Sequence, residues 1–164
     1  MSSIASATRR RGSLTQTSAP RLPGRVIHEF DPWFNFRATE YMVANGWAKF
    51  QAWFDEGVWY PLGRHVGSTT YPGLQLTAWA IHSALHAAGY PVSLNDVCVF
   101  MPAGFGALAA AMTGLLAWEV TRRPNAAVAA TAIMAILPAH LMRSIAGGFD
   151  NESIAISAMV KIRM

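Results

Sequence analysis

Two long uncharged stretches, separated by a pair of arginines, constrain this chain more than any other feature of its sequence. The first covers residues 97–118, the second covers residues 124–142, and Arg122 and Arg123 lie between them. About 20 apolar residues in a helix span the hydrocarbon core of a bilayer, so each stretch is long enough to cross. Both are rich in alanine and glycine, and small residues let helices pack closely in lipid. We therefore predict a transmembrane helical hairpin, with helices over 97–121 and 124–142 and a turn at 122–123.

The composition agrees with a membrane protein. Hydrophobic residues make up 52% of the 164 residues. Charged residues make up 13%, against roughly a quarter in an ordinary soluble domain. The single cysteine, Cys98, excludes an internal disulfide framework and a zinc site built from several cysteines. The alternative, a buried hairpin of a soluble protein, is disfavoured because both stretches match the thickness of a bilayer.

The net charge of +4 is concentrated at the N-terminus. Five of the 13 basic residues fall within residues 1–27, which contain no acid, and the other eight are offset by all nine acids. A surface for a phosphate backbone would be confined to this segment, so we do not expect nucleic acid as a partner. We predict that residues 1–27 form a disordered basic tail. The same composition fits an organelle transit peptide or a misassigned start.

The two arginines also predict the orientation of the hairpin. Positive residues in short loops mark the cytoplasmic side of a membrane, so the turn at 122–123 is expected to be cytosolic. Both ends of the hairpin then face the lumen. Residues 28–96 become a first lumenal loop, and residues 143–164 become a second one.

The predicted first lumenal loop combines aromatic residues with short helices. Many of the chain's aromatic residues fall between positions 30 and 60, and such side chains gather at the headgroup level of membranes. Asp31 and Pro32 predict a helix start, and Gly46 predicts its end. A second amphipathic helix should follow, with Trp47 and Phe50 on its apolar face together with Trp53 and Phe54.

A further apolar stretch, residues 71–90, is too short to cross. The helix available within it covers residues 74–88 and also carries Gln75, His82 and His86. That length fits an interfacial or re-entrant helix better than a span. The two histidines have the i, i+4 spacing of metal ligands, but a third ligand is not evident, so we interpret them as part of a polar face.

Four of the nine acids form two short motifs of the pattern acid-x-acid. The motifs are Glu29-Phe30-Asp31 and Asp150-Asn151-Glu152, and the predicted topology brings both to the lumenal face. Carboxylates that meet repel one another unless a cation joins them, and hard oxygen ligands select Mg²⁺ or Mn²⁺. Such a cation would stabilise a phosphate or pyrophosphate leaving group. The alternative is that both motifs are solvated loop charges.

Five blocks of sequence, in order, carry a family resemblance. They cover residues 28–35 with 37–39, 59–64, 71–74, 96–100, and 143–144 with 146–152. Together they resemble the catalytic subunit of eukaryotic oligosaccharyltransferase, the enzyme that N-glycosylates proteins in the endoplasmic reticulum. The resemblance extends over residues 28–157.

The resemblance implies a role for each acidic motif. Asp31 would ligate Mn²⁺ or Mg²⁺ and contact the amide of the acceptor asparagine. Asp150 and Glu152 would complete this part of the metal shell, and Arg143 matches an arginine important for activity. The implied reaction is inverting transfer of an oligosaccharide from dolichyl diphosphate to the asparagine of an Asn-X-Ser/Thr sequon.

The resemblance also implies a fold, a cellular location and partners for the chain. It predicts an all-α, polytopic membrane protein that forms the N-terminal part of a GT-C type fold. Its location would be the endoplasmic reticulum membrane, with several crossings and with both acidic motifs in the lumen. Its partners would be the lipid-linked donor, the acceptor polypeptide and other oligosaccharyltransferase subunits.

The sequence also departs from the family pattern. A transmembrane helix normally precedes the first motif, where this chain has its basic tail. The later lumenal glutamate, the arginine facing the donor and the C-terminal domain with a Trp-Trp-Asp motif are not found. We therefore expect an incomplete N-terminal part that is inactive alone. The alternatives are a non-catalytic membrane or assembly protein, and another dolichol-dependent enzyme such as a protein O-mannosyltransferase, which residues 30–35 and 149–152 argue against.

Overall fold

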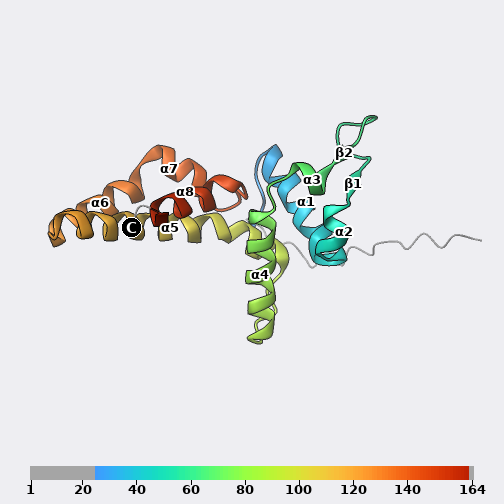
Figure 1. Ribbon diagram of the computed structural model, residues 1–164. Helices are drawn as coiled ribbons and strands as arrows, with labels where there is room; N and C mark the ends of the chain where they lie inside the picture. Colours follow the sequence, from blue (N-terminus) through green and yellow to red (C-terminus); the bar gives the residue numbers. More distant parts are fainter. Residues whose placement is uncertain (1–24, 163–164) are drawn as a thin grey trace, which may run out of the picture.

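The computed structural model describes residues 25–162, and this part of the chain is mostly helical (Figure 1). The helices and strands, in order, are α1 (Phe30–Asn45), α2 (Trp47–Gln51), β1 (Phe54–Asp55), β2 (Arg64–His65), α3 (Val66–Thr69), α4 (Gly73–Ala87), α5 (Leu94–Thr121), α6 (Pro124–Ile136), α7 (Pro138–Ser144) and α8 (Asn151–Ile162). Figure 1 shows α5 running beside α6, α7 and α8, with α1–α3 and the two strands at its other end. Helix α4 projects across the axis of α5 at the junction.

Helix α5 is the longest element and organises the second half of the structure. It begins after Ser93, whose hydroxyl accepts a hydrogen bond from the backbone N–H of Asp96 at 3.1 Å. It ends where Arg122 adopts a left-handed conformation with φ of 54°. Within residues 25–162, α5 is long and apolar enough to cross a membrane, and α6 with α7 would be a second crossing if the bent pair is one span. That the turn at 122–123 is cytosolic stays a prediction.

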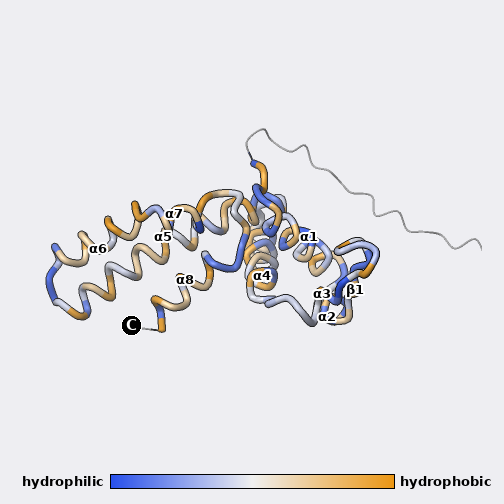
Figure 2. Tube along the Cα trace, turned by 90° about the horizontal axis from the view of Figure 1, so that it is seen from above, coloured by the Kyte–Doolittle hydropathy of each residue, from blue (hydrophilic) through white to orange (hydrophobic). Residues whose placement is uncertain are grey.

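Helix α6 packs along α5 through small residues. A side-chain carbon at Gly114 would overlap the hydroxyl of Thr131 and would lie 3.1 Å from the carbonyl oxygen of Ala127. Small residues at such positions let helix backbones approach in lipid. Figure 2 shows apolar residues along these helices and a hydrophilic turn between α5 and α6. The packing therefore agrees with a membrane hairpin.

The prediction of one continuous helix over residues 124–142 is wrong. Helix α6 ends at Ile136, Leu137 is extended with ψ of 119°, and α7 begins at Pro138. The two helices are bent by 62°. Proline lacks an amide hydrogen and forces the preceding residue out of the helical region, so Pro138 starts a new helix in a new direction.

Residues 143–162, the described part of the predicted second lumenal loop, are largely helical. Helix α7 continues to Ser144, and α8 occupies Asn151–Ile162. Ser153 and Ser157 are buried on one face of α8, and the hydroxyl of Ser157 donates to the carbonyl of Phe105 at 2.9 Å. Small side chains spaced i, i+4 thus let α8 lie directly on α5.

Two details of the predicted first lumenal loop are corrected. Helix α1 begins at Phe30, and within the described chain no side-chain hydrogen bond caps its first turn, so Asp31 is not the cap. Helix α2 ends at Gln51, and Phe54 lies in strand β1, so the longer amphipathic helix is wrong. In the same region, Arg37 of α1 forms an ion pair with Asp55 of β1 at 3.0 Å.

Two predictions in the same region are confirmed. Helix α1 ends at Asn45, and Gly46 has φ of 81°, a conformation that glycine adopts without strain. Helix α4 has 15 residues, which confirms the short helix expected there. Between them, a small core holds the aromatic segment together: Ala38, Met42, Phe50 and Val66.

A second core joins the two halves of the structure at the start of α5. Its buried residues are Ile27, Phe36, Leu74, Ala78, Cys98, Val99, Met101 and Phe149. They come from the segment before α1, from α1, α4 and α5, and from the segment before α8. Ile27 is only 1% exposed, and Arg25 pairs with Asp96 at 3.0 Å, so the predicted disordered tail does not extend over residues 25–27. The rest of that predicted tail, residues 1–24, lies outside the described part of the chain.

Candidate functional site

The segment that precedes the second acidic motif is fixed at Gly147. Its amide N–H donates to the carbonyl of Val99 in α5 at 2.9 Å, and its carbonyl accepts from the amide of His28 at 3.0 Å. Gly147 has φ of 92°, and a side-chain carbon there would lie 2.5 Å from the carbonyl oxygen of Val26. Glycine alone suits both the conformation and the space. The N-terminal segment, α5 and the acidic segment therefore meet at this residue.

Asn35 connects α1 to the second acidic motif. Its side-chain amide donates to the carbonyl of Phe149 at 3.3 Å and to Oδ1 of Asp150 at 3.2 Å. Asn35 is 4% exposed, and Phe149 is completely buried. Buried polar groups need partners, because an unsatisfied one costs about 1–3 kcal/mol. Two segments more than 100 residues apart in sequence are thus held together by one side chain.

One carboxylate of the second acidic motif is paired with an arginine side chain. Arg143, at the end of α7, forms an ion pair with Glu152 at 3.1 Å. Partial burial and, next, the carboxylate of Asp150 raise the pKa of Glu152, while Arg143 opposes this change. The two carboxylates therefore interact unfavourably, and one of them is already paired. Asn151, between them, is half-buried at the start of α8.

A small hollow of about 30 Å³ lies where these segments meet. Its lining includes Glu29 from the first motif, Asp150 and Glu152 from the second, and Arg143. Asp31 is not among the residues that line this hollow, and it is exposed on the first turn of α1. The structure thus brings one acid of the first motif, Glu29, to the second motif and leaves Asp31 outside the hollow, open to solvent.

The fit of a metal ion can be judged from these groups. Within residues 25–162, no group of three or more His, Cys, Asp or Glu side chains lies close enough to hold a metal ion. The donor chemistry does suit Mn²⁺ or Mg²⁺, because carboxylate oxygens are their preferred ligands. The repulsion that raises the pKa of Glu152 is also what a bound cation would relieve. Asp150 and Glu152 therefore fit as part of a shell that needs further ligands.

Sequence reasoning missed the roles of Asn35 and His28. Both lie inside the first block of the family resemblance, but neither is an acid and neither was singled out. One signal was present: Asn35 follows Asp31 by four residues and so shares its helix face. Its burial and its long-range partners depend on the folded chain and could not be deduced from spacing.

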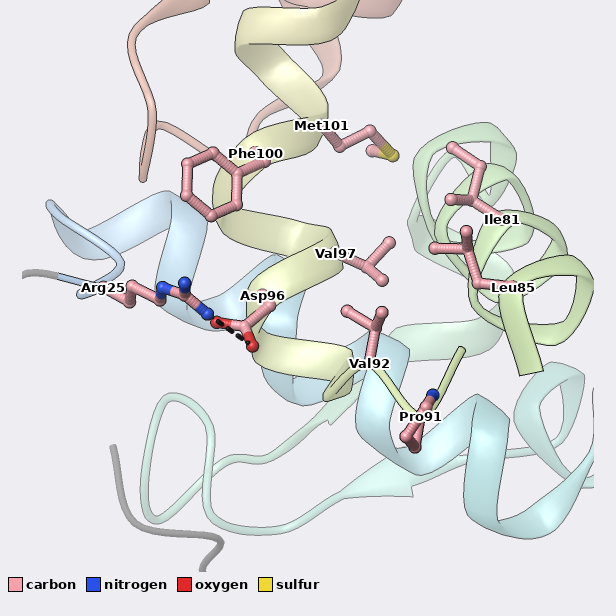
Figure 3. Close-up of a pocket in the computed structure, with 9 residues that line it drawn as sticks. All are labelled: Arg25, Ile81, Leu85, Pro91, Val92, Asp96, Val97, Phe100 and Met101. Carbon is pink, nitrogen blue, oxygen red and sulfur yellow. Dashed lines mark ion pairs between the residues drawn. The ribbon is translucent and has the colours of Figure 1, made fainter. Parts of the chain in front are cut away.

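A second, larger hollow is separate from the acidic motifs. It has a volume of about 540 Å³ and lies between α4 and α5, with Ile81 and Leu85 on one side and Val97 and Met101 on the other (Figure 3). The ion pair of Arg25 with Asp96 lies at its edge. None of its lining residues belongs to either acidic motif.

Comparison with known proteins tests the resemblance. Residues 22–164 match the family described as oligosaccharyl transferase STT3, N-terminal. The chain belongs to the STT3 family. The predicted resemblance is thereby confirmed, and the alternative of a protein O-mannosyltransferase is set aside.

Named STT3 relatives give the same result. The chain is 50% identical over 134 residues to the dolichyl-diphosphooligosaccharide–protein glycosyltransferase subunit stt-3 of Caenorhabditis elegans, covering 82% of this chain and 18% of the relative. It is 48% identical over 135 residues to the corresponding STT3 subunit of Dictyostelium discoideum, covering 82% of this chain and 19% of that protein. The chain thus spans about a fifth of the length of the curated relatives it matches.

Proposed function

We propose that this chain supplies the acidic-motif part of an oligosaccharyltransferase catalytic subunit. The complete enzyme would transfer an oligosaccharide from dolichyl diphosphate to the asparagine of Asn-X-Ser/Thr sequons by inversion. It would act in the endoplasmic reticulum membrane, with both motifs in the lumen, with Mn²⁺ or Mg²⁺ and with other subunits. Membership in the STT3 family and the names of the relatives support this proposal.

The observation that carries the proposal is the link from Asn35 to Phe149 and Asp150. It joins the helix that bears the first motif to the second motif, so that groups from both share one hollow. Solvated loop charges would need no such link. The acids of the hollow lie near the start of the apolar helix α5, where Gly147 is bonded to Val99. This place suits them to contact a lipid-linked pyrophosphate and a polypeptide at the membrane surface.

The chemistry of the acceptor explains why carboxylates are needed. The nitrogen of an amide is a poor nucleophile, because its lone pair is delocalised into the carbonyl group. Asp31 is exposed on the first turn of α1, where its carboxylate can accept hydrogen bonds from the acceptor NH₂ and weaken that delocalisation. A divalent cation held by Asp31, Asp150 and Glu152 would supply charge stabilisation for the departing pyrophosphate.

The remaining residues of the site hold these carboxylates. Asn35 fixes Asp150 from the buried side, and Arg143 fixes Glu152 from α7. Because Arg143 is half-exposed, its guanidinium can also approach an anionic group in the hollow. The chain would thus orient the acids and leave Asp31 free to contact the acceptor.

The test is glycosylation of a sequon peptide by the complete enzyme that contains this chain. Asp31→Ala should lower the rate of transfer by about 10³-fold or more. The acceptor amide would lose a hydrogen-bond acceptor, and the cation would lose a ligand. Glu119→Ala is the control, because Glu119 is an exposed acid paired with Arg122 at the far end of α5. Wild-type turnover in Asp31→Ala would contradict the proposal and would favour a non-catalytic membrane or assembly protein.

A further inference from the structure

A buried histidine links α7 to α5 just before Arg143. His140 is 5% exposed, and its Nε2 lies 3.1 Å from the carbonyl oxygen of Gly106. A carbonyl only accepts hydrogen bonds, so Nε2 carries the hydrogen of this bond. Nδ1 is buried without a partner among the described residues. A side chain that served only for packing would avoid this cost if it were apolar.

The contact is close enough to require glycine in α5. A side-chain carbon at Gly106 would overlap the Cβ of Ser144 and would lie 2.8 Å from its hydroxyl. The hydroxyl of Ser144 donates to the carbonyl of His140 at 2.7 Å, so both residues of α7 are engaged at this crossing. Gly104, two residues earlier in α5, is different: outside its own helix, no described atom lies within 4 Å of a Cβ placed there.

Helix α7 needs such an anchor. It has seven residues and is separated from α6 by the bend at Pro138. Helices this short are not stable in isolation, so tertiary contacts decide where α7 lies. Arg143 is three residues after His140 on this helix, and it forms the ion pair with Glu152.

Two other hydrogen bonds tie the following residues to the same helix. The amide of Gly147 donates to the carbonyl of Val99, and the hydroxyl of Ser157 donates to the carbonyl of Phe105. Carbonyl groups of α5 thus bind the chain on both sides of the second acidic motif. His140 supplies the bond that lies before Arg143.

We propose that His140 is a positioning residue of the acidic site: its hydrogen bond to Gly106 fixes α7 on α5 and so sets where Arg143 meets Glu152. The task assigned to Arg143 and Glu152 rests on the proposed function. The bond and its effect on the local structure do not. They can be measured on this chain without any assay of activity.

The experiment is amide hydrogen exchange on the full chain in lipid nanodiscs, read at Gly147 and Asp150. His140→Met removes the donor and should raise exchange at both amides by about fivefold, the size expected for loss of one net hydrogen bond. His140→Gln keeps an N–H donor of similar reach and should stay within about twofold of wild type. Gly106→Ala should resemble His140→Met, whereas Gly104→Ala, the matched control, should resemble wild type.

Two results of the exchange experiment would overturn the proposal. One is unchanged exchange in His140→Met, and the other is equal loss of protection in His140→Met and His140→Gln, which would mean that shape alone matters. The ¹⁵N spectrum of labelled histidine in the unmutated chain gives a second reading that does not depend on any variant folding. It should show His140 with hydrogen on Nε2, and hydrogen on Nδ1 alone would overturn the proposal.

In the complete enzyme, the same pair of variants separates positioning from binding. His140→Met should lower kcat with little change in the KM for the acceptor peptide, and His140→Gln should restore kcat. If Asp31→Ala retains turnover while the exchange results hold, the proposed function fails and the structural role of His140 stands. If the exchange results fail while Asp31→Ala is inactive, only the role of His140 is wrong.

Discussion

The two acidic motifs have the same pattern, acid-x-acid, but different surroundings. Asp150 and Glu152 are half-buried, and each has a partner: the side chain of Asn35 for Asp150 and Arg143 for Glu152. The acids of the first motif are exposed at the start of α1, where Glu29 has φ of 67° and no side-chain hydrogen bond caps the helix among the described residues.

The different surroundings of the two motifs make one part of the site rigid and the other accessible. The second motif is held by long-range contacts, so its carboxylates have fixed positions before any ligand arrives. The first motif lies at a helix N-terminus, which stabilises a negative charge without burying it. We infer that the second motif organises the site and that the first motif meets the substrate.

Among the variants that alter one motif and not the other, Gly147→Ala should have the largest effect on stability. A side chain at this left-handed position would collide with the backbone of Val26, so the second motif would lose its fixed place. We expect a loss of about 2–4 kcal/mol in the free energy of unfolding. Gly73→Ala is the control, because no described atom outside its helix lies within 4 Å of a Cβ there. Denaturant titration in micelles measures both, and an equal, small change in the two variants would contradict the account.

A second prediction is that substitutions in the two motifs change the free energy of unfolding by different amounts. Asp150→Ala leaves the buried amide of Asn35 short of a partner, so we expect the free energy of unfolding to fall by about 1–3 kcal/mol. Asp31→Ala removes an exposed side chain, and the change should stay within about 0.5 kcal/mol. Thermal unfolding of both variants under one condition tests this contrast. Similar losses would mean that the two motifs are held in the same way.

A third and smaller effect concerns pH. Because the pKa of Glu152 is raised in the folded chain, folded Glu152 binds a proton more tightly than unfolded Glu152. Its contribution to stability therefore decreases as the pH rises through the folded pKa. Arg143→Gln should raise this pKa further and steepen the decrease, and Glu152→Gln should remove it. Unfolding measured against pH without divalent cations checks both variants, and a slope of opposite sign would refute the assignment.

Much of the helical plan was predictable from local signals. The uncharged run of α5, the arginines at its end, the stop at Gly46 and the short helix α4 each depend on a few neighbouring residues. The order of the family blocks also predicted that the chain belongs to a glycosyltransferase family. The helical features follow from chain length, charge and backbone preference, whereas the family assignment follows from the resemblance of the sequence blocks.

The corrected features depend on contacts between distant residues or on competing local rules. Pro138 was visible, but prolines occur within membrane helices, so the sequence did not decide between a kink and a new helix. The pairing of Arg37 with Asp55 was not predicted, because it depends on the hairpin of β1 and β2, which brings Asp55 to α1. The role of Asn35 required its partner 115 residues away.

We propose that the two motifs form one site through the contact between Asn35 and Asp150. A double-mutant cycle with Asn35→Ala and Asp150→Ala, read by the free energy of unfolding, tests it most directly. We expect a coupling energy of about 1–2 kcal/mol, because either single change already breaks the bond. Additive losses, with a coupling below about 0.5 kcal/mol, would show that the two residues act independently and would contradict the account.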